Sequence, residues 1–249
     1  MTARLPRERR HTLFFLQEVR SFAPVFLDTE VDMTQVLAHR TRARAAGRRY
    51  SPVSYVVLCA GQILAKHPDA NAAVQGRLRP KVAHYPFAHG KVTLDKQQGG
   101  HRVVLATIVR DVQERDLEEV QRHLDRFRTG DPDRMPEFAA IRRLHARPWP
   151  LALAAFRRAA RALPVRPALT GTYAVTSLGH RDVDGFHSVG GTTVTLGVGR
   201  ITDRPVVRDG EVTVAPVMRL SLAFDHRVID GAEAADVLTE VKSALEGYR

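Results

Sequence analysis

The stretch LSLAFDHRVIDGAEAADVL, residues 220–238, joins two different patterns. Its first part alternates apolar and polar side chains, which predicts a strand. The strand pattern stops at residues 225–227, Asp-His-Arg, and an alanine-rich helical pattern follows from Gly231. A polar turn between strand and helix would account for these charges without any function. The alternative is that the strand ends where His226 can project into a cleft and act as a base.

The composition is that of an ordinary globular protein, with 44% hydrophobic and 26% charged residues among 249. No window approaches the roughly 20 uninterrupted apolar residues of a membrane span. The apolar patch at 13–16 is too short for a signal peptide and has no small-residue cleavage site after it. The single cysteine, Cys59, lies in an apolar run, which predicts that it is a core residue. We therefore expect a cytoplasmic protein.

Predicted helices and strands intermix along the chain without a repeat or a linker-like stretch, which favours one α/β domain over residues 1–249. The apolar periodicity predicts helices over 7–20, 34–49, 51–67, 116–127, 136–163 with a break at 148–150, and 232–245. Thr34 is the expected cap of the second helix. Alternation predicts strands over 25–33, 81–87, 91–95, 101–109, 171–178, 192–201, 205–217 and 218–224, with Asp209-Gly210 as a hairpin turn.

The segment FDHRVIDGAEAA, residues 224–235, resembles the signature of the chloramphenicol acetyltransferase-like fold, as in the dihydrolipoamide acyltransferases at the cores of 2-oxo acid dehydrogenase complexes. Four further segments resemble the same family in the same order: VFLDTEVDMTQVL, LCAGQILAKHPDANAAV, GTYAVTSLG and TLGVGRITDRPVVRDGEVTVAPVMRLSLAFDHR. The resemblance spans nearly the whole chain and is strongest after residue 168. It implies a two-layer α/β fold with a mixed sheet, packed helices and a trimeric assembly.

The resemblance also gives His226 a role. A free thiol has a pKa of about 8.5 and is mostly protonated at neutral pH, whereas an unperturbed imidazole, with a pKa of about 6.5, can accept its proton. The family implies that His226 is the general base acting on the thiol of coenzyme A or of a dihydrolipoyl group. It implies that Asp230 holds the histidine loop. In the related chloramphenicol enzymes this aspartate pairs with an N-terminal arginine, for which Arg9 and Arg10 both remain candidates.

Attack on a thioester produces an oxyanion, which needs a fixed hydrogen-bond donor. In the family a hydroxyl at the strand end of GTYAVTSLG supplies it, and Thr176 is the matching residue. Ser177 is next to it, but successive side chains of a strand point to opposite faces, so only one of the two can face the cleft. We favour Thr176. The family trimer places the histidine of one subunit opposite this hydroxyl of its neighbour.

Coenzyme A is thus expected as a substrate, and no metal is expected. The loop GHRDVDGFH, residues 179–187, carries two histidines and two aspartates that could pass for a metal cluster. It is rich in turn residues, and the family uses no metal.

The chain departs from complex-forming acyltransferases in having no lipoyl-type stretch and no peripheral-subunit binding domain in the sequence. We expect the acyl acceptor to be a dihydrolipoyl group on a separate chain, another pantetheine-bearing carrier, or a small acceptor used together with coenzyme A. The alternative function is a non-catalytic trimeric scaffold that keeps the fold and binds dehydrogenase-type partners.

The net charge is 38 − 27 = +11. Residues 141–166 hold seven arginines and no acid, and the first fifty residues hold ten arginines against five acids. Three interpretations of segment 141–166 are open. We favour an amphipathic helix whose arginines face solvent; the alternatives are a site for coenzyme A phosphates or an acidic carrier, and a helix that lies on a membrane surface. Nucleic-acid binding is not predicted, because no helix-turn-helix, zinc knuckle or aromatic RNA-binding strand accompanies the charge.

Overall fold

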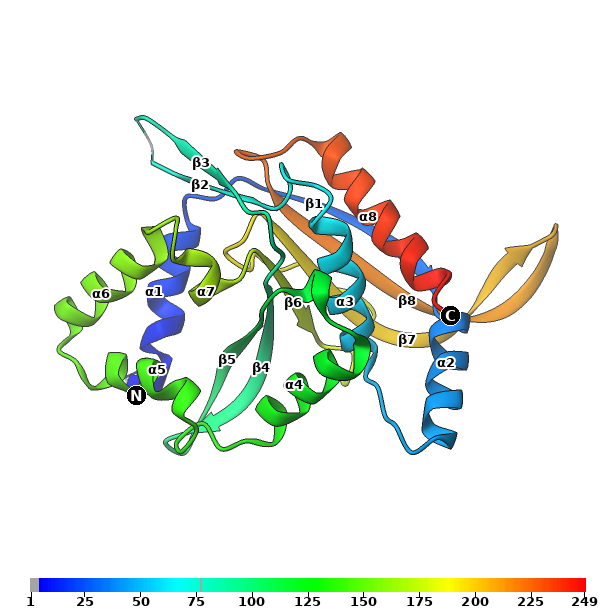
Figure 1. Ribbon diagram of the computed structural model, residues 1–249, viewed down its shortest axis with the longest axis horizontal. Coiled ribbons are helices and arrows are strands. Elements are labelled where there is room, and N and C mark those ends of the chain that lie inside the picture. Colours follow the sequence, from blue (N-terminus) through cyan, green and yellow to red (C-terminus); the bar gives the residue numbers. More distant parts are fainter. Residues whose placement is uncertain (1–4, 77) are drawn as a thin grey trace, which may run out of the picture.

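A computed structural model describes residues 5–76 and 78–249. Its centre is a six-stranded mixed sheet in the order β1-β8-β7-β6-β4-β5, and a separate two-stranded hairpin, β2-β3, stands beside it (Figure 1). The strands are β1 (Pro24–Asp32), β2 (Ala72–Gln75), β3 (Lys81–His84), β4 (Gly90–Gln98), β5 (His101–Val109), β6 (Tyr173–Ser177), β7 (Val194–Arg208) and β8 (Glu211–Asp225). The α-helices are α1 (Arg10–Val19), α2 (Thr34–Ala45), α3 (Pro52–Leu64), α4 (Leu117–Thr129), α5 (Ala139–Ala146), α6 (Trp149–Arg161), α7 (Arg166–Thr170) and α8 (Gly231–Glu246). The α/β class with a mixed sheet and packed helices is confirmed.

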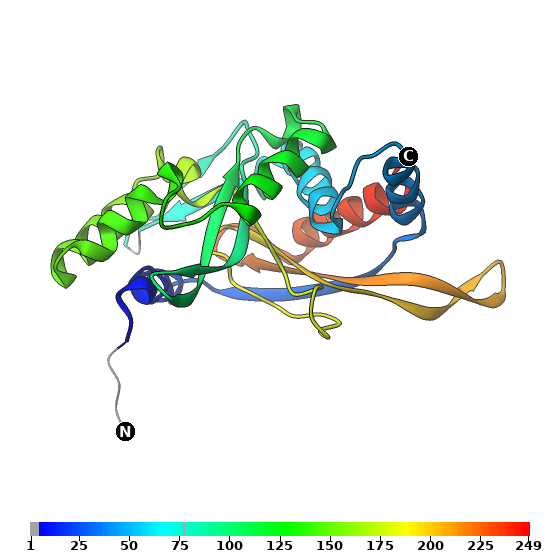
Figure 2. The same cartoon turned by 90° about the horizontal axis from the view of Figure 1, so that it is seen from below.

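The two longest strands form one hairpin. Asp209 and Gly210 both have positive φ angles, 52° and 86°, and Arg208 pairs directly with Glu211 across the turn. This is the two-residue turn that an Asp-Gly pair favours. The three strands expected over 192–224 are in fact two strands of 15 residues each. The hairpin tip extends well beyond the rest of the sheet (Figures 1 and 2).

Seen from below, most of the helices form one layer over the sheet, whereas α1 lies beside the edge of the sheet (Figure 2). The core between this layer and the sheet is centred on α3, whose residues are buried over most of its length. Tyr173 of β6 is fully buried and donates its hydroxyl to the carbonyl of Val57 on α3 at 2.6 Å, which ties the helix to the middle of the sheet. Cys59 is 2% exposed and belongs to this core, as expected.

Several local expectations need correction. Thr34 is not the cap of α2: the helix begins at this residue, and the Asp32 carboxylate accepts from its N–H at 2.9 Å. The strand expected over 81–87 ends at His84 and pairs with β2, which was not predicted. Asp116 caps α4 in a full capping box with Glu119, one residue before the first helical position.

The region expected to be helical over 136–163 is divided at Pro148 into α5 and α6. Both helices lie beside α1 at one end of the molecule, away from the β7-β8 hairpin (Figure 1). Among the described residues, the helices are all too short or too polar to cross a membrane.

Candidate active site

His226 follows the last residue of β8, and the chain around it is fixed by backbone hydrogen bonds. Its N–H donates to the carbonyl of Ala23, just before β1, at 2.9 Å. The N–H of Val228 donates to the carbonyl of Asp225 at 2.9 Å, which closes a turn. The imidazole side chain remains 45% exposed. The strand end therefore holds the backbone of His226 in place while its ring projects from the sheet.

Asp225 fixes this turn from within. Its side chain is 2% exposed, and its carboxylate forms an ion pair with Arg227. The same carboxylate accepts from the backbone N–H of Ala23 at 3.3 Å and of Arg227 at 3.2 Å. A buried carboxylate needs such partners, because burying it alone is costly. The role of Asp225 was missed from the sequence, although a charged residue at the end of an apolar strand was a signal for it.

Asp230 is the N-cap position of α8 and comes within 3.4 Å of the His226 ring, between Oδ1 and Nδ1. Its side chain is 90% exposed. The expected N-terminal arginine partner does not reach it in the part of the chain that the structure describes. Arg10 instead donates to the carbonyls of His145 and Arg147, at 3.0 Å each. Arg9 lines the groove described below.

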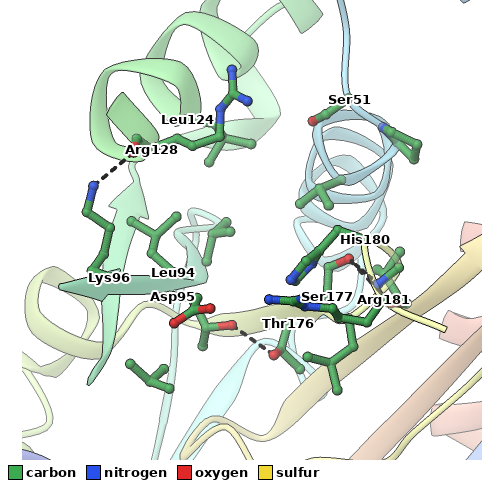
Figure 3. A pocket seen from close by; sticks show the side chains of 18 of the residues that line it. Ser51, Leu94, Asp95, Lys96, Leu124, Arg128, Thr176, Ser177, His180 and Arg181 are labelled. Carbon is green, nitrogen blue, oxygen red and sulfur yellow. Dashed lines mark hydrogen bonds between the residues drawn. The ribbon is translucent and has the colours of Figure 1, made fainter. Parts of the chain in front are cut away.

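Thr176 lies where the sheet opens. β4 pairs with β6 only through residues 90–92 and 173–175, after which their backbones are no longer paired. At the next position the contact is made by side chains: the hydroxyl of Thr93 donates to the hydroxyl of Thr176 at 2.8 Å (Figure 3). Because Thr176 accepts this bond, its own proton is left free to be donated elsewhere. Thr93 was not predicted, since nothing local in the sequence pairs two residues 83 positions apart.

Ser177 makes different contacts. Its hydroxyl lies 3.4 Å from the carbonyl of Val198 and accepts from the N–H of Gly179 at 3.2 Å. One contact reaches the neighbouring strand β7 and the other lies in the turn after β6, and both Thr176 and Ser177 line the groove described below, although only one of them was expected to face it. Ser177 therefore stabilises the turn, which agrees with the preference for Thr176.

The opening between β4 and β6 is the floor of a groove of about 1360 Å³. Its walls are the start of α3, one face of α4, and the turn after β6 that carries His180 and Arg181 (Figure 3). Thr93 and Thr176 both line it. Among the described residues, the groove is lined by six cationic side chains and only two carboxylates. The cations are Arg9, Arg49, Lys96, Arg102, Arg128 and Arg181, and the carboxylates are Asp95 and Asp125. The groove therefore suits an anionic ligand.

His226 does not line this groove in the described subunit. The register places Thr176 opposite Gly197, and Gly197 opposite Ser221, on three adjacent strands. His226 is five residues beyond Ser221, so the rise along the strand and two strand spacings separate the two Cα atoms by about 19 Å. One subunit alone does not bring the two groups together.

Other candidate groups are accounted for by packing. Burial raises the pKa of the Cys59 thiol to about 12, which makes it a poor nucleophile. In the loop 179–187, Asp182 and Asp184 pair with Arg200, and Asp184 also pairs with Arg204. The ring of His187 packs against Phe26. Both aspartates are thus held by arginines, and His187 packs against an aromatic ring instead of joining them.

Residues 154–249, which contain Thr176, His226 and Asp230, match the family model described as 2-oxoacid dehydrogenases acyltransferase (catalytic domain). The chain is 28% identical over 225 residues to the dihydrolipoyllysine-residue acetyltransferase component of the pyruvate dehydrogenase complex of Bacillus subtilis, covering 89% of this chain and 44% of that protein. It is 25% identical over 249 residues to the component of the same name from Staphylococcus aureus, covering 98% and 51%. The chain spans about half the length of these relatives.

Solved structures show the same architecture over the whole chain. The dihydrolipoamide acetyltransferase of Azotobacter vinelandii superposes with a TM-score of 0.74 at 20% identity, covering 100% of this chain and 92% of that one. A probable dihydrolipoamide acetyltransferase of Listeria monocytogenes gives 0.71 at 18% identity, covering 99% and 94%. A chloramphenicol acetyltransferase gives 0.54 at 16% identity, covering 97% and 96%. The resemblance read from the sequence is therefore confirmed: the chain has the chloramphenicol acetyltransferase-like fold, and its residues 154–249 match the catalytic domain of the 2-oxoacid dehydrogenase acyltransferases.

Proposed function

We propose that this protein is an acyltransferase that moves an acyl group between coenzyme A and a second thiol, in a trimer that joins His226 of one subunit to Thr176 of its neighbour. The observation that carries the proposal is the Thr176 hydroxyl, which accepts from Thr93 at 2.8 Å on the floor of a cationic groove. The match of the surrounding residues to an acyltransferase family supports it.

In this reaction, Nε2 of His226 takes the proton of the attacking thiol. Asp230, near Nδ1, favours the tautomer that carries a proton on Nδ1 and leaves Nε2 as the acceptor. The thiolate attacks the thioester carbonyl carbon, and the Thr176 hydroxyl donates to the oxyanion that forms. When the intermediate collapses, the carbon–sulfur bond to the leaving thiolate breaks and His226 returns the proton to that sulfur.

The separation of the two groups supports a shared site. About 19 Å within one subunit is too far for both to contact one thioester, whereas a closed ring of identical subunits repeats any contact between neighbours. In the Azotobacter vinelandii enzyme, a serine, a histidine and an asparagine have been investigated for their role in the catalytic mechanism. That histidine and asparagine are four positions apart, as are His226 and Asp230.

We further propose that residues 1–249 act as one catalytic-type domain and that the second thiol is a dihydrolipoyl group or a similar arm on another chain. The cationic excess in the groove supports a phosphate-bearing thiol such as coenzyme A, because guanidinium groups bind phosphate well.

The proposal is tested by supplying acetyl-coenzyme A and free dihydrolipoamide and measuring the acylated product by mass spectrometry. Wild-type protein should transfer the acetyl group to dihydrolipoamide, and the rate of transfer by His226→Ala should be lower by about 10²- to 10⁴-fold. His84→Ala is the matched control, because His84 is an exposed histidine on β3 outside the groove. No turnover by wild-type trimers with any acyl-coenzyme A donor, together with recovery of dehydrogenase partners on pull-down, would favour the scaffold function instead.

A further inference from the structure

A strongly basic surface borders the groove on the side of α2. No acidic residue occurs between Met33 and Tyr50, while this stretch holds five arginines. Four of them are exposed, namely Arg42, Arg44, Arg48 and Arg49, and we call Arg42, Arg48 and Arg49 the arginine patch. In the part of the chain that the structure describes, one carboxylate forms an ion pair with this patch. It is that of Glu118, which lies 4.0 Å from the guanidinium of Arg48 and whose side chain is 52% exposed. The patch therefore keeps most of its positive charge.

The three arginines lie at one end of α2. The N–H of Arg48 donates to the carbonyl of Ala43 at 2.9 Å, and Ala43 follows Arg42 in the last turn of that helix. Arg48 is therefore held beside the helix end that carries Arg42. Arg49 follows Arg48 directly and lines the groove. The patch thus runs from the end of α2 to the rim of the groove that contains Thr176.

The backbone that carries the patch is held firmly. The side chain of Arg40 donates to the carbonyl of Tyr50 at 2.8 Å. The N–H of Ser51 donates to the side-chain oxygen of Gln121 on α4 at 2.7 Å, and the buried hydroxyl of Ser54 donates to the same oxygen at 2.6 Å. The loop between α2 and α3 is therefore fixed at both the helix and the groove. A surface ordered in advance loses less freedom on binding.

The other basic segment, 141–166, has a different character. Arg142 donates to the carbonyl of Met135, and Arg166 to that of Gly191, both at 2.8 Å. Arg157 and Arg161 both pair with Glu18. Within the described residues, no member of 141–166 lines the groove. Much of its charge is thus used in holding α5, α6 and α7 in place.

We propose that the arginine patch is the docking surface for an acidic carrier domain, which rests on it while its thiol-bearing arm enters the groove toward Thr176. The inference rests on the proposed function and names the partner of that site. Opposite charge is the argument for this occupant: an exposed cationic surface attracts an acidic one and speeds their encounter. All three side chains are exposed, so they present a surface to a macromolecule instead of enclosing a small anion.

The test measures binding without turnover. An isolated, fluorescently labelled lipoyl domain of net negative charge is titrated with the full chain at low and at high salt, and anisotropy is recorded. Wild-type protein should bind at low salt and release the domain at high salt. The double variant Arg42→Glu/Arg48→Glu should weaken binding roughly tenfold, and Arg42→Gln/Arg48→Gln roughly threefold, because the patch loses its attraction stepwise.

The matched control is Arg143→Glu/Arg158→Glu, which reverses two exposed charges on α5 and α6 and should leave the affinity within about twofold. Thermal unfolding of every variant shows that the fold is kept. No binding of the acidic domain by wild-type protein at low salt, or weakening by the control equal to that by the patch variant, would overturn the proposal. So would a single-stranded oligonucleotide or an anionic vesicle that binds more tightly than the domain and depends on the same two arginines. Failure of the acyltransferase function appears separately, as no transfer to free dihydrolipoamide.

Discussion

Replacing Thr176 by valine removes one hydroxyl and little else. Valine has nearly the same shape and is as favourable in a strand as threonine. In the folded protein, the substitution deletes the acceptor of the Thr93 hydroxyl, a single hydrogen bond of 2.8 Å between half-buried side chains. Its loss should lower the free energy of unfolding by about 1 kcal/mol, which leaves the protein folded.

The effect on catalysis should be much larger. If Thr176 donates to the oxyanion, its removal should lower kcat by about 10²- to 10³-fold, or about 3–4 kcal/mol in the barrier. KM for the acyl-coenzyme A donor should change little, because the hydroxyl is needed only when charge develops on the carbonyl oxygen. Initial rates at varied donor concentration, with free dihydrolipoamide as the acceptor, give both parameters.

Ser177→Ala is the matched control. It removes a neighbouring hydroxyl of the same groove, one that contacts the carbonyl of Val198 on β7 and the N–H of Gly179 in the turn after β6. We expect kcat within a few-fold of wild type. Near wild-type kcat in Thr176→Val, or a large loss confined to Ser177→Ala, would refute the assignment of Thr176.

Three further outcomes are expected. Thr93→Val removes the hydrogen-bond donor to the Thr176 hydroxyl. If that hydroxyl acts as proposed, kcat should fall by about tenfold with little change in stability, and no change in kcat would exclude this positioning role. Arg227→Met leaves the buried carboxylate of Asp225 without its cation, so the free energy of unfolding should fall by about 3 kcal/mol. Urea denaturation measures it, and an unchanged value would contradict the importance of this ion pair. Burial lowers the pKa of His145 to about 4, and the charge of His11 is the second cause. Burial also lowers the pKa of His11. Because unfolding raises these pKa values toward about 6.5, the unfolded state binds more protons, and stability should fall as the pH drops from about 6.5 toward 4. His145→Gln should reduce this acid sensitivity in urea melts, and an identical pH profile in the variant would refute the cause.

Some features could be predicted because their cause is local in the sequence. The Asp209-Gly210 turn requires two residues with positive φ, which this pair adopts readily, so the hairpin turn was expected, although the length of its strands was not. The end of β8 just before His226 was marked by the change from alternating apolar residues to charges. The capping box of α4 follows from Asp116 and Glu119 three positions apart.

Other features depend on contacts between distant segments. Thr93 matters only because β4 lies beside β6 and leaves it at that point. The short β2 has too few residues to show a period, and its pairing with β3 defines it. Arg49 and Arg181 come together in one groove from loops that the sequence separates by more than a hundred residues. Such convergence is a property of the packed chain and has no local signal.

The central claim is that each active site takes His226 from one subunit and Thr176 from its neighbour, and mixed trimers test it most directly. His226→Ala and Thr176→Val chains carrying different affinity tags are purified separately, then unfolded and refolded together in equal amounts. Each variant alone should be nearly inactive. In the mixture, a site is intact when one subunit supplies the threonine and its neighbour the histidine, so random assembly should restore about one quarter of wild-type kcat per site. A mixture of tag-verified mixed trimers that stays as inactive as its two parents would contradict the shared site.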